Sequence, residues 1–371
     1  MHIPDGYLSP STCAVLYAAA MPFWAAALRR VRALLATRFV PLVSLFAAFS
    51  FVIMMFNLPL PGGTTGHAAG IAMAAIVLGP WGATIAISVA LAIQALLFGD
   101  GGILALGANC FNIAVAGSWT AAAVYRLVAG SSPIDARRRV LAGGLAGYCA
   151  INVAALLTAF ELGLQPLLFH DATGAALYAP YPLAVALPAM MLGHLTFAGF
   201  AEGLLTAGVV RYLQQSERGL LGSGAFGGGV ASPTPAVGAP RPAPTFFAAR
   251  GLWALLGLLL VLSPLGLLAA GSAWAEWSPE DFSDPAARAG IAAASGGALL
   301  PAAAPSGLVQ LSALWTAPLP DYAPAFLRSA TMGYLVSAFV GVGLILLAVA
   351  GLQAIGDRFR RGGSPAALSQ E

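Results

Sequence analysis

Charged residues are scarce in this chain of 371 residues: Asp, Glu, Lys and Arg make up 8% of it, and hydrophobic residues 59%. A soluble globular protein carries about 25% charged residues to cover its surface. Lysine is absent, and the 17 basic residues are all arginines that cluster beside apolar segments. Because such clusters report membrane topology and not a nucleic-acid surface, we expect a membrane protein that binds no nucleic acid.

Patterns typical of enzymes are also missing. Cys13, Cys110 and Cys149 are isolated within apolar segments, so we interpret them as small hydrophobic residues. No GxxxxGK[ST] motif occurs, so any ATP-driven step must draw its energy from another subunit. The absence of an HExxH pair and of an Asp cluster at membrane depth argues against an intramembrane metalloenzyme. We therefore predict a protein that is not an enzyme and holds no cofactor.

Apolar segments recur along the chain, and a membrane-spanning helix needs about 20 such residues. The candidate spans are residues 11–28, 39–56, 67–79, 82–98, 104–128, 140–160, 182–212, 251–272 and 330–354. The third is short, and the sequence LGPWG at 78–82 predicts a tight turn into the fourth. The fold class that we expect is an all-α polytopic membrane bundle of seven helices, followed by a two-helix C-terminal unit.

The arginines predict which side of the membrane each loop faces. If the N-terminus lies outside, the positive-inside rule is satisfied, because every arginine except Arg288 and Arg328 falls on the cytoplasmic side. The C-terminus is then cytoplasmic. We expect a multi-pass protein of the inner cell membrane, in contact with lipid and with a mature start at its first codon.

The chain divides into two membrane units. Residues 1–215 form the first, and a Gly-, Ala-, Pro- and Ser-rich segment at 216–249 predicts a flexible cytoplasmic linker. Residues 250–371 form the two-helix unit. Its extracytoplasmic loop, 273–329, is long enough to fold against the first unit but contains no His or Cys, so we expect it to donate no metal ligand.

The N-terminus offers metal-binding chemistry that an internal residue lacks. The α-amine of Met1, the amide nitrogen of His2 and the Nδ1 atom of the same imidazole can chelate one ion in fused five- and six-membered rings. His67, which ends a Gly-rich loop on the same predicted side, would complete a planar set of four nitrogens. Such a set suits Ni(II) or Cu(II) better than tetrahedral Zn(II). The amide must lose its proton, so binding should weaken as the pH falls.

Residues in three neighbouring segments are predicted to support this site. Asp5 follows Pro4 in a turn of the N-terminal segment, and Thr65 lies in the loop before His67. Polar side chains of a further loop, those of Asp100, Asn109 and Asn112, are candidates to orient the imidazoles by hydrogen bonds.

The structural alternatives stay open at this point. His2 and His67 can both be hydrogen-bonded structural residues, and Gly-rich loops commonly serve helix packing. We expect His170 to be solvated. His194 and Glu202 are eight residues apart on one predicted helix, so we interpret them as a polar pair inside the bundle, although a contact with a partner is also possible.

Three motifs resemble those of a known family: MHIPDGYLSP at the start of the chain, NLPLPGGTTGH at 57–67 and QALLFGDGGILALGANCFN at 94–112. They are similar to the CbiM/NikM family, the substrate-binding (S) components of energy-coupling factor transporters for cobalt and nickel, over about residues 1–215. The segment SPLGLLAAGSAWAEW at 263–277 resembles the small NikN component, of the PDGLE type, which makes the whole similar to a fused NikMN arrangement.

The resemblance implies a metal site formed by Met1, His2 and His67, and it implies partners: a transmembrane coupling (T) protein and cytoplasmic ATPase subunits. Cobalt-type relatives place Cys or Ser before the second His and Pro after it, whereas Gly66 and Ala68 flank His67 here, which favours nickel. The expected function is Ni(II) import. Co(II) uptake for cobalamin synthesis, a membrane metal sensor and a component for an organic vitamin are the alternatives.

Overall fold

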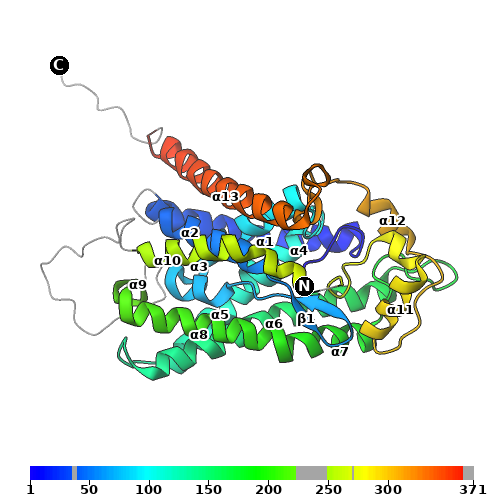
Figure 1. Ribbon diagram of the computed structural model, residues 1–371, viewed down its shortest axis with the longest axis horizontal. Helices are drawn as coiled ribbons and strands as arrows, with labels where there is room; N and C mark the ends of the chain where they lie inside the picture. The colour runs from blue at the N-terminus through cyan, green and yellow to red at the C-terminus, as the bar shows by residue number, and fades with distance from the viewer. Residues whose placement is uncertain (36–39, 223–248, 270, 362–371) are drawn as a thin grey trace, which may run out of the picture.

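The computed structural model describes residues 1–35, 40–222, 249–269 and 271–361, which are mostly helical (Figure 1). The first part of the chain forms α1 (Pro10–Leu35), α2 (Val40–Met54), α3 (Ile71–Ile93), η1 (Gln94–Phe98), α4 (Leu106–Asn109), η2 (Cys110–Gly117), α5 (Ser118–Ala129), α6 (Arg137–Leu168), α7 (Leu183–Gly193), η3 (His194–Ala198), α8 (Gly199–Ser216) and α9 (Arg218–Gly222). The second part forms α10 (Arg250–Leu262), η5 (Ser263–Leu268), η6 (Pro279–Phe282), α11 (Pro285–Ala294), α12 (Ser306–Ser312), η7 (Pro320–Tyr322), η8 (Ala325–Leu327) and α13 (Ala330–Arg361). A short antiparallel hairpin joins β1 (Leu58–Leu60) to β2 (Thr64–Gly66).

Six of the described helical stretches are long and apolar enough to cross a membrane, and α2 is a shorter apolar helix. They are Pro10–Val31, Ile71–Phe98, Arg137–Leu168, Leu183–Ser216, Arg250–Leu268 and Ala330–Ile355. The mean hydropathy of the best window in α13 reaches 2.6, a value that only sequences almost free of charge can have. The predicted all-α membrane fold is confirmed. The predicted linker 216–249 lies mostly outside the described residues, and its first residues are helical in α8 and α9.

The stretch Ile71–Phe98 folds back on itself. Its 28 residues would span ~42 Å as one straight helix. Yet the residues just beyond its two ends, His67 and Asp100, both contact His2. The chain reverses at Gly79, whose φ of 74° and ψ of 168° are not helical. This reversal is the tight turn that the LGPWG motif predicts, and it brings both ends of the stretch to one site.

Three short segments are π-helical: η1 ends the stretch Ile71–Phe98, η2 lies between α4 and α5, and η3 lies between α7 and α8. A π-helical turn contains one extra residue, which changes the direction of the side chains that follow, and such turns are frequent at functional sites. Each of the three carries a buried polar side chain, Gln94, Asn112 or His194. The π-helical segments therefore bring polar groups into an otherwise apolar interior.

The C-terminal unit packs along the first unit and covers one end of it. In Figure 1, α13 and α10 run along α2, and α11 and α12 lie at the end of the bundle opposite α9. We call these two ends the α12 end and the α9 end. The hydroxyl of Tyr7 donates a hydrogen bond of 2.8 Å to the carbonyl of Trp277, which ties the N-terminal segment to the C-terminal unit.

Candidate metal centre

The first residues of the chain are buried inside the bundle. Met1 and His2 are only 2% and 1% exposed. The amide of Ile3 donates to the side-chain oxygen of Asn109 at 2.8 Å, and the side-chain nitrogen of Asn109 donates to the carbonyl of Ile3 at 3.0 Å. Asp5 accepts hydrogen bonds from the backbone of residues 103 and 105. These bonds satisfy the polar backbone of a non-helical segment in the interior, and so hold His2 in place.

A buried carboxylate fixes the loop that carries His67. This loop follows β2 and leads into α3. One carboxylate oxygen of Glu202, on α8, accepts hydrogen bonds from the amides of Ala69 at 2.8 Å and Gly70 at 2.9 Å. These amides precede the first turn of α3, where N–H groups have no partner within the helix. Glu202 thus anchors the chain beside His67, which is 6% exposed.

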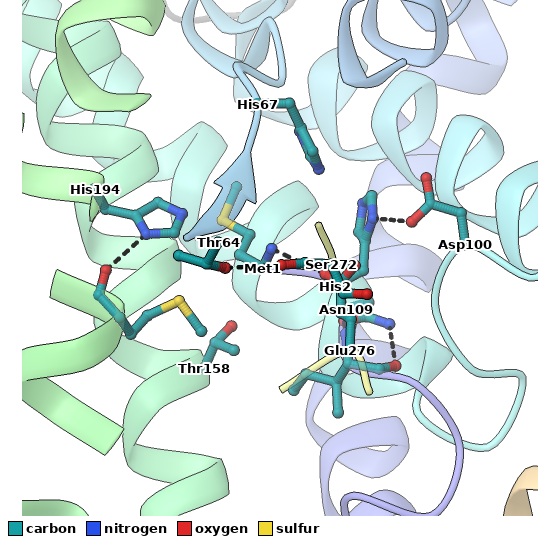
Figure 2. Close-up of polar contacts among 12 residues, drawn as sticks. Met1, His2, Thr64, His67, Asp100, Asn109, Thr158, His194, Ser272 and Glu276 are labelled. Atoms are coloured by element: carbon teal, nitrogen blue, oxygen red, sulfur yellow. Dashed lines mark hydrogen bonds and ion pairs between the residues drawn. The ribbon is translucent and has the colours of Figure 1, made fainter. Parts of the chain in front are cut away.

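The two imidazoles face each other. Their ring centroids are 5.0 Å apart, and Figure 2 shows the His67 ring directed toward the space between His2 and the Met1 amine. Nδ1 of His67 donates to the carbonyl of Ala68 at 3.0 Å, which leaves the lone pair of its Nε2 free. Nδ1 of His2 is hydrogen-bonded to Asp100, and Nε2 of His2 is buried without a hydrogen-bond partner among the described residues.

Two groups of the C-terminal unit reach this site. The amine of Met1 forms an ion pair with Glu276 over 3.3 Å, shown in Figure 2. The hydroxyl of Tyr322 donates to the second carboxylate oxygen of Asp100 at 2.6 Å, and Gln94 donates to the same oxygen at 3.0 Å. Glu276 therefore links the C-terminal unit to the Met1 amine, and Asp100 is contacted both by the N-terminal segment and by the C-terminal unit.

The electrostatic surroundings favour a neutral His67. Burial, followed by the positive charges of His2 and of the N-terminal amine, lowers the pKa of His67 to about 3. Burial raises the pKa of Asp100, but the charge and hydrogen bond of His2 outweigh it and hold that pKa below its usual range. Burial raises the pKa of Glu276. Near neutral pH, His67 can thus offer a lone pair to a cation.

The predicted supporting residues lie in four different settings. Asp100 is hydrogen-bonded to Nδ1 of His2. The side chains of Asp5 and Asn109 form hydrogen bonds with backbone groups and do not contact an imidazole. Thr65 lies in β2, where its amide donates to the carbonyl of Ser272 at 3.3 Å. Asn112 does not join the site: its side-chain nitrogen donates to Thr158 at 3.2 Å and to Glu161 at 2.8 Å, because η2 directs it toward α6.

The remaining histidines lie apart from the two imidazoles. His170 is exposed, as expected. The prediction of a His194–Glu202 pair is wrong, because η3 lies between the two residues and changes their angular spacing. Glu202 binds backbone amides before α3, and Nδ1 of His194 donates to the carbonyl of Met190 at 2.8 Å.

Sequence reasoning missed Gln94, Glu276 and Tyr322. Glu276 lies between two tryptophans in the motif AWAEW, and an acidic residue in this aromatic setting was the one available signal. Tyr322 is 222 residues from Asp100 in the chain, and no spacing rule connects them.

The donors available here are unusual for a metal site. Among the described residues, no three side chains of His, Cys, Asp or Glu meet where they could hold a metal ion. The nitrogen donors that do meet here are the amine of Met1 and the imidazoles of His2 and His67, all three in buried residues.

Comparison with known proteins agrees with this arrangement. Residues 2–220 match the family described as CbiM, Cobalt uptake substrate-specific transmembrane region. The chain is 57% identical to the fused nickel transport protein NikMN of Rhodobacter capsulatus over 96% of this chain and 99% of that protein. It is 41% identical to the probable fused nickel transport protein LarMN of Lactiplantibacillus plantarum, over 95% and 98% of the two chains.

A solved structure is also similar. A crystal structure of a truncated transition metal transporter is 53% identical, with a TM-score of 0.55, and the match covers 58% of this chain and 99% of that one. The similarity to the two fused relatives extends through the C-terminal unit. The chain thus belongs to the CbiM family of nickel and cobalt transport proteins, fused to a NikN-like unit.

Proposed function

We propose that this protein is the nickel-binding membrane subunit of an ATP-driven energy-coupling factor transporter that imports Ni(II). The Met1 amine, the amide and imidazole nitrogens of His2 and the imidazole of His67 form the ligand set. The observation that carries the proposal is the burial of these three residues at one point, with the rings of His2 and His67 5.0 Å apart. A planar set of nitrogens is a geometry that Ni(II) prefers.

Loading requires a rearrangement of His2. The chelate uses Nδ1 of His2, which is hydrogen-bonded to Asp100 in the structure. A half-turn of the ring about its Cβ–Cγ bond places Nδ1 toward the amine and Nε2 toward the side of Asp100. Asp100 can then accept the Nε2 proton, the hydrogen bond that carboxylates commonly provide to metal-bound imidazoles. The Met1 amine must also leave Glu276 and lose its proton.

Transport itself needs partners. We infer a transmembrane coupling protein and cytoplasmic ATPase subunits, because the chain has no phosphate-binding GxxxxGK[ST] loop. We also infer that the α12 end faces outward and the α9 end faces the cytoplasm. The arginines support this orientation, since three of them lie near the end of α1, Arg126 lies in the last turn of α5 and three more begin α6.

The free N-terminus provides the decisive test. Purified protein loaded with Ni(II) should show the yellow absorption band of planar nickel, with one ion per chain. A variant with one extra residue ahead of Met1 should lose that band, because its amine is displaced. Equal nickel binding by both proteins would refute the ligand set.

Cobalt import is the second candidate, because relatives of 36% identity are named cobalt transport protein CbiM, for example in Geobacter sulfurreducens. The same nitrogens can bind Co(II), although they bind Ni(II) more strongly in the general order of divalent-metal affinities. Competition of Co(II) against the nickel band, together with uptake of each metal by cells, separates the two. Co-purification of the coupling and ATPase subunits would argue against a metal sensor with no transport role.

A further inference from the structure

A small cavity lies on the side of Met1 that faces α7. Its volume of about 10 Å³ is close to what one water molecule or a small ion needs. Its lining includes the Met1 side chain, Thr64, Met190 and His194. In Figure 2, the Met1 side chain extends from its amine toward the His194 ring. The cavity therefore adjoins the proposed chelate.

His194 presents an unused nitrogen to this cavity. The residue is 4% exposed, and its Nδ1 donates to the carbonyl of Met190 at 2.8 Å. The lone pair is therefore on Nε2, the ring nitrogen that the bond to Met190 does not use. His67 has the same arrangement, because its Nδ1 donates to the backbone carbonyl of Ala68. A backbone carbonyl that fixes the tautomer is a common companion of a metal-binding imidazole.

The other donors are soft or neutral. Met1 and Met190 contribute thioethers, and thioethers bind late transition metals better than Mg²⁺ or Ca²⁺. The hydroxyl of Thr64 donates to the carbonyl of Ser272 at 2.9 Å, so its oxygen lone pairs remain available. No Asp or Glu lines the cavity. A cation held by neutral donors alone binds more weakly than in a site with an anionic amide nitrogen.

We propose that this cavity is a second metal position, which holds the incoming divalent transition-metal ion before it enters the chelate. The proposal rests on the proposed function and names the route by which the site is loaded. A transit position must bind an ion strongly enough to accept it and weakly enough to release it, which matches a neutral donor set. Met1 connects the two positions, because its side chain lines the cavity and its amine belongs to the chelate.

Two substitutions in the full-length chain test this position. His194→Asn keeps an N–H group that can donate to Met190 and removes the Nε2 lone pair. Met190→Leu removes a thioether with little change of volume and keeps the carbonyl that His194 uses. The matched controls are His170→Asn, at an exposed histidine, and Met191→Leu, at a neighbour outside the cavity lining.

The measurement is the rate at which the planar Ni(II) band develops after rapid mixing of purified protein with Ni(II). Both test variants should load severalfold more slowly than wild type, with the same final amplitude and band position, and both controls should load at the wild-type rate. Wild-type loading by His194→Asn and Met190→Leu would overturn the proposal, because the cavity would then hold only water. Met190→Leu decides the question alone if His194→Asn does not fold.

Two further results would contradict either the separate metal position or the proposed function. A shifted band in His194→Asn at equilibrium would show that His194 is a ligand of the chelate itself, which contradicts a separate position. Failure of the proposed function looks different: wild-type protein would then show no planar band that depends on His67 and the free amine.

Discussion

At the scale of single residues, the metal centre depends on groups that orient ligands without binding metal. Asp100 shows this clearly, because it contacts His2 through one oxygen and receives Tyr322 and Gln94 on the other. The hydrogen bonds from Tyr322 and Gln94 fix the orientation of the Asp100 carboxylate. Asp100 can thereby hold the His2 ring through Nδ1 as observed and, after the half-turn that the proposed loading requires, through Nε2.

Replacement of Asp100 by Asn should therefore weaken Ni(II) binding by about 10–100-fold, the usual cost of losing a partner of a metal-bound imidazole. A titration against a competing chelator measures the affinity. Asp171→Asn is the matched control, since Asp171 is exposed and bonds only its own turn. An unchanged affinity in Asp100→Asn would contradict the role of this carboxylate.

His67 predicts how the stability of the metal-free protein depends on pH. Its pKa falls from 6.5 to about 3 on folding, so between these values the unfolded chain binds one more proton than the folded chain. The free energy of unfolding should then fall as the pH is lowered through this range, by up to about 1.4 kcal/mol per pH unit. Thermal unfolding of metal-free protein at several pH values measures this effect. His67→Gln should show a flatter pH profile, and a profile identical to wild type would count against a neutral buried His67.

At the scale of elements, packing between the two units depends on glycine in the N-terminal turn. Gly6 has a φ of +94°, and a Cβ atom built there would lie 2.7 Å from the Cα of Leu308 in α12. A side chain at this position would therefore separate α12 from the segment that carries His2.

Gly6→Ala should lower the free energy of unfolding by about 1–3 kcal/mol more than a glycine substitution without a clash, because the crowded backbone must move. Gly174→Ala is the control: its φ of +85° is equally unfavourable for alanine, and no atom lies within 4 Å of the added carbon. Thermal unfolding of the two variants gives the comparison. Equal losses of stability would mean that α12 moves away at little cost.

The sequence predicted where helices and turns lie better than it predicted the direction of individual side chains. Hydropathy predicted the spans, and LGPWG predicted the reversal at Gly79, because apolar length and turn chemistry are local properties. The π-helical segments were not predicted, since tertiary packing stabilises them and no residue pattern marks them. As a result, Asn112 and His194 point in directions that a regular helix would not give.

At the scale of the whole molecule, the two units share one site. The proposed ligands come from the first unit, as the free amine and the histidines predicted. The contacts of Glu276 and Tyr322 with that site come from the second unit. The sequence does not predict these contacts, because they depend on how the two units pack.

Removal of residues 250–371 should abolish uptake and leave nickel bound, because all the proposed ligands remain. Metal content of the purified truncated protein and uptake of Ni(II) by cells measure the two properties. An N-terminal extension of the same truncated protein provides the reference for lost binding. Loss of nickel without the extension would show that the second unit supplies a ligand.

The reversal within α3 has a mechanical consequence. His67 precedes one arm of this hairpin and Asp100 follows the other, while the turn between the arms lies at the α9 end, where Arg30 stacks 4.6 Å above the ring of Trp81. A displacement of the turn is therefore transmitted along both helical arms to the residues on either side of His2. The hairpin thus couples the α9 end of the bundle mechanically to the candidate metal centre.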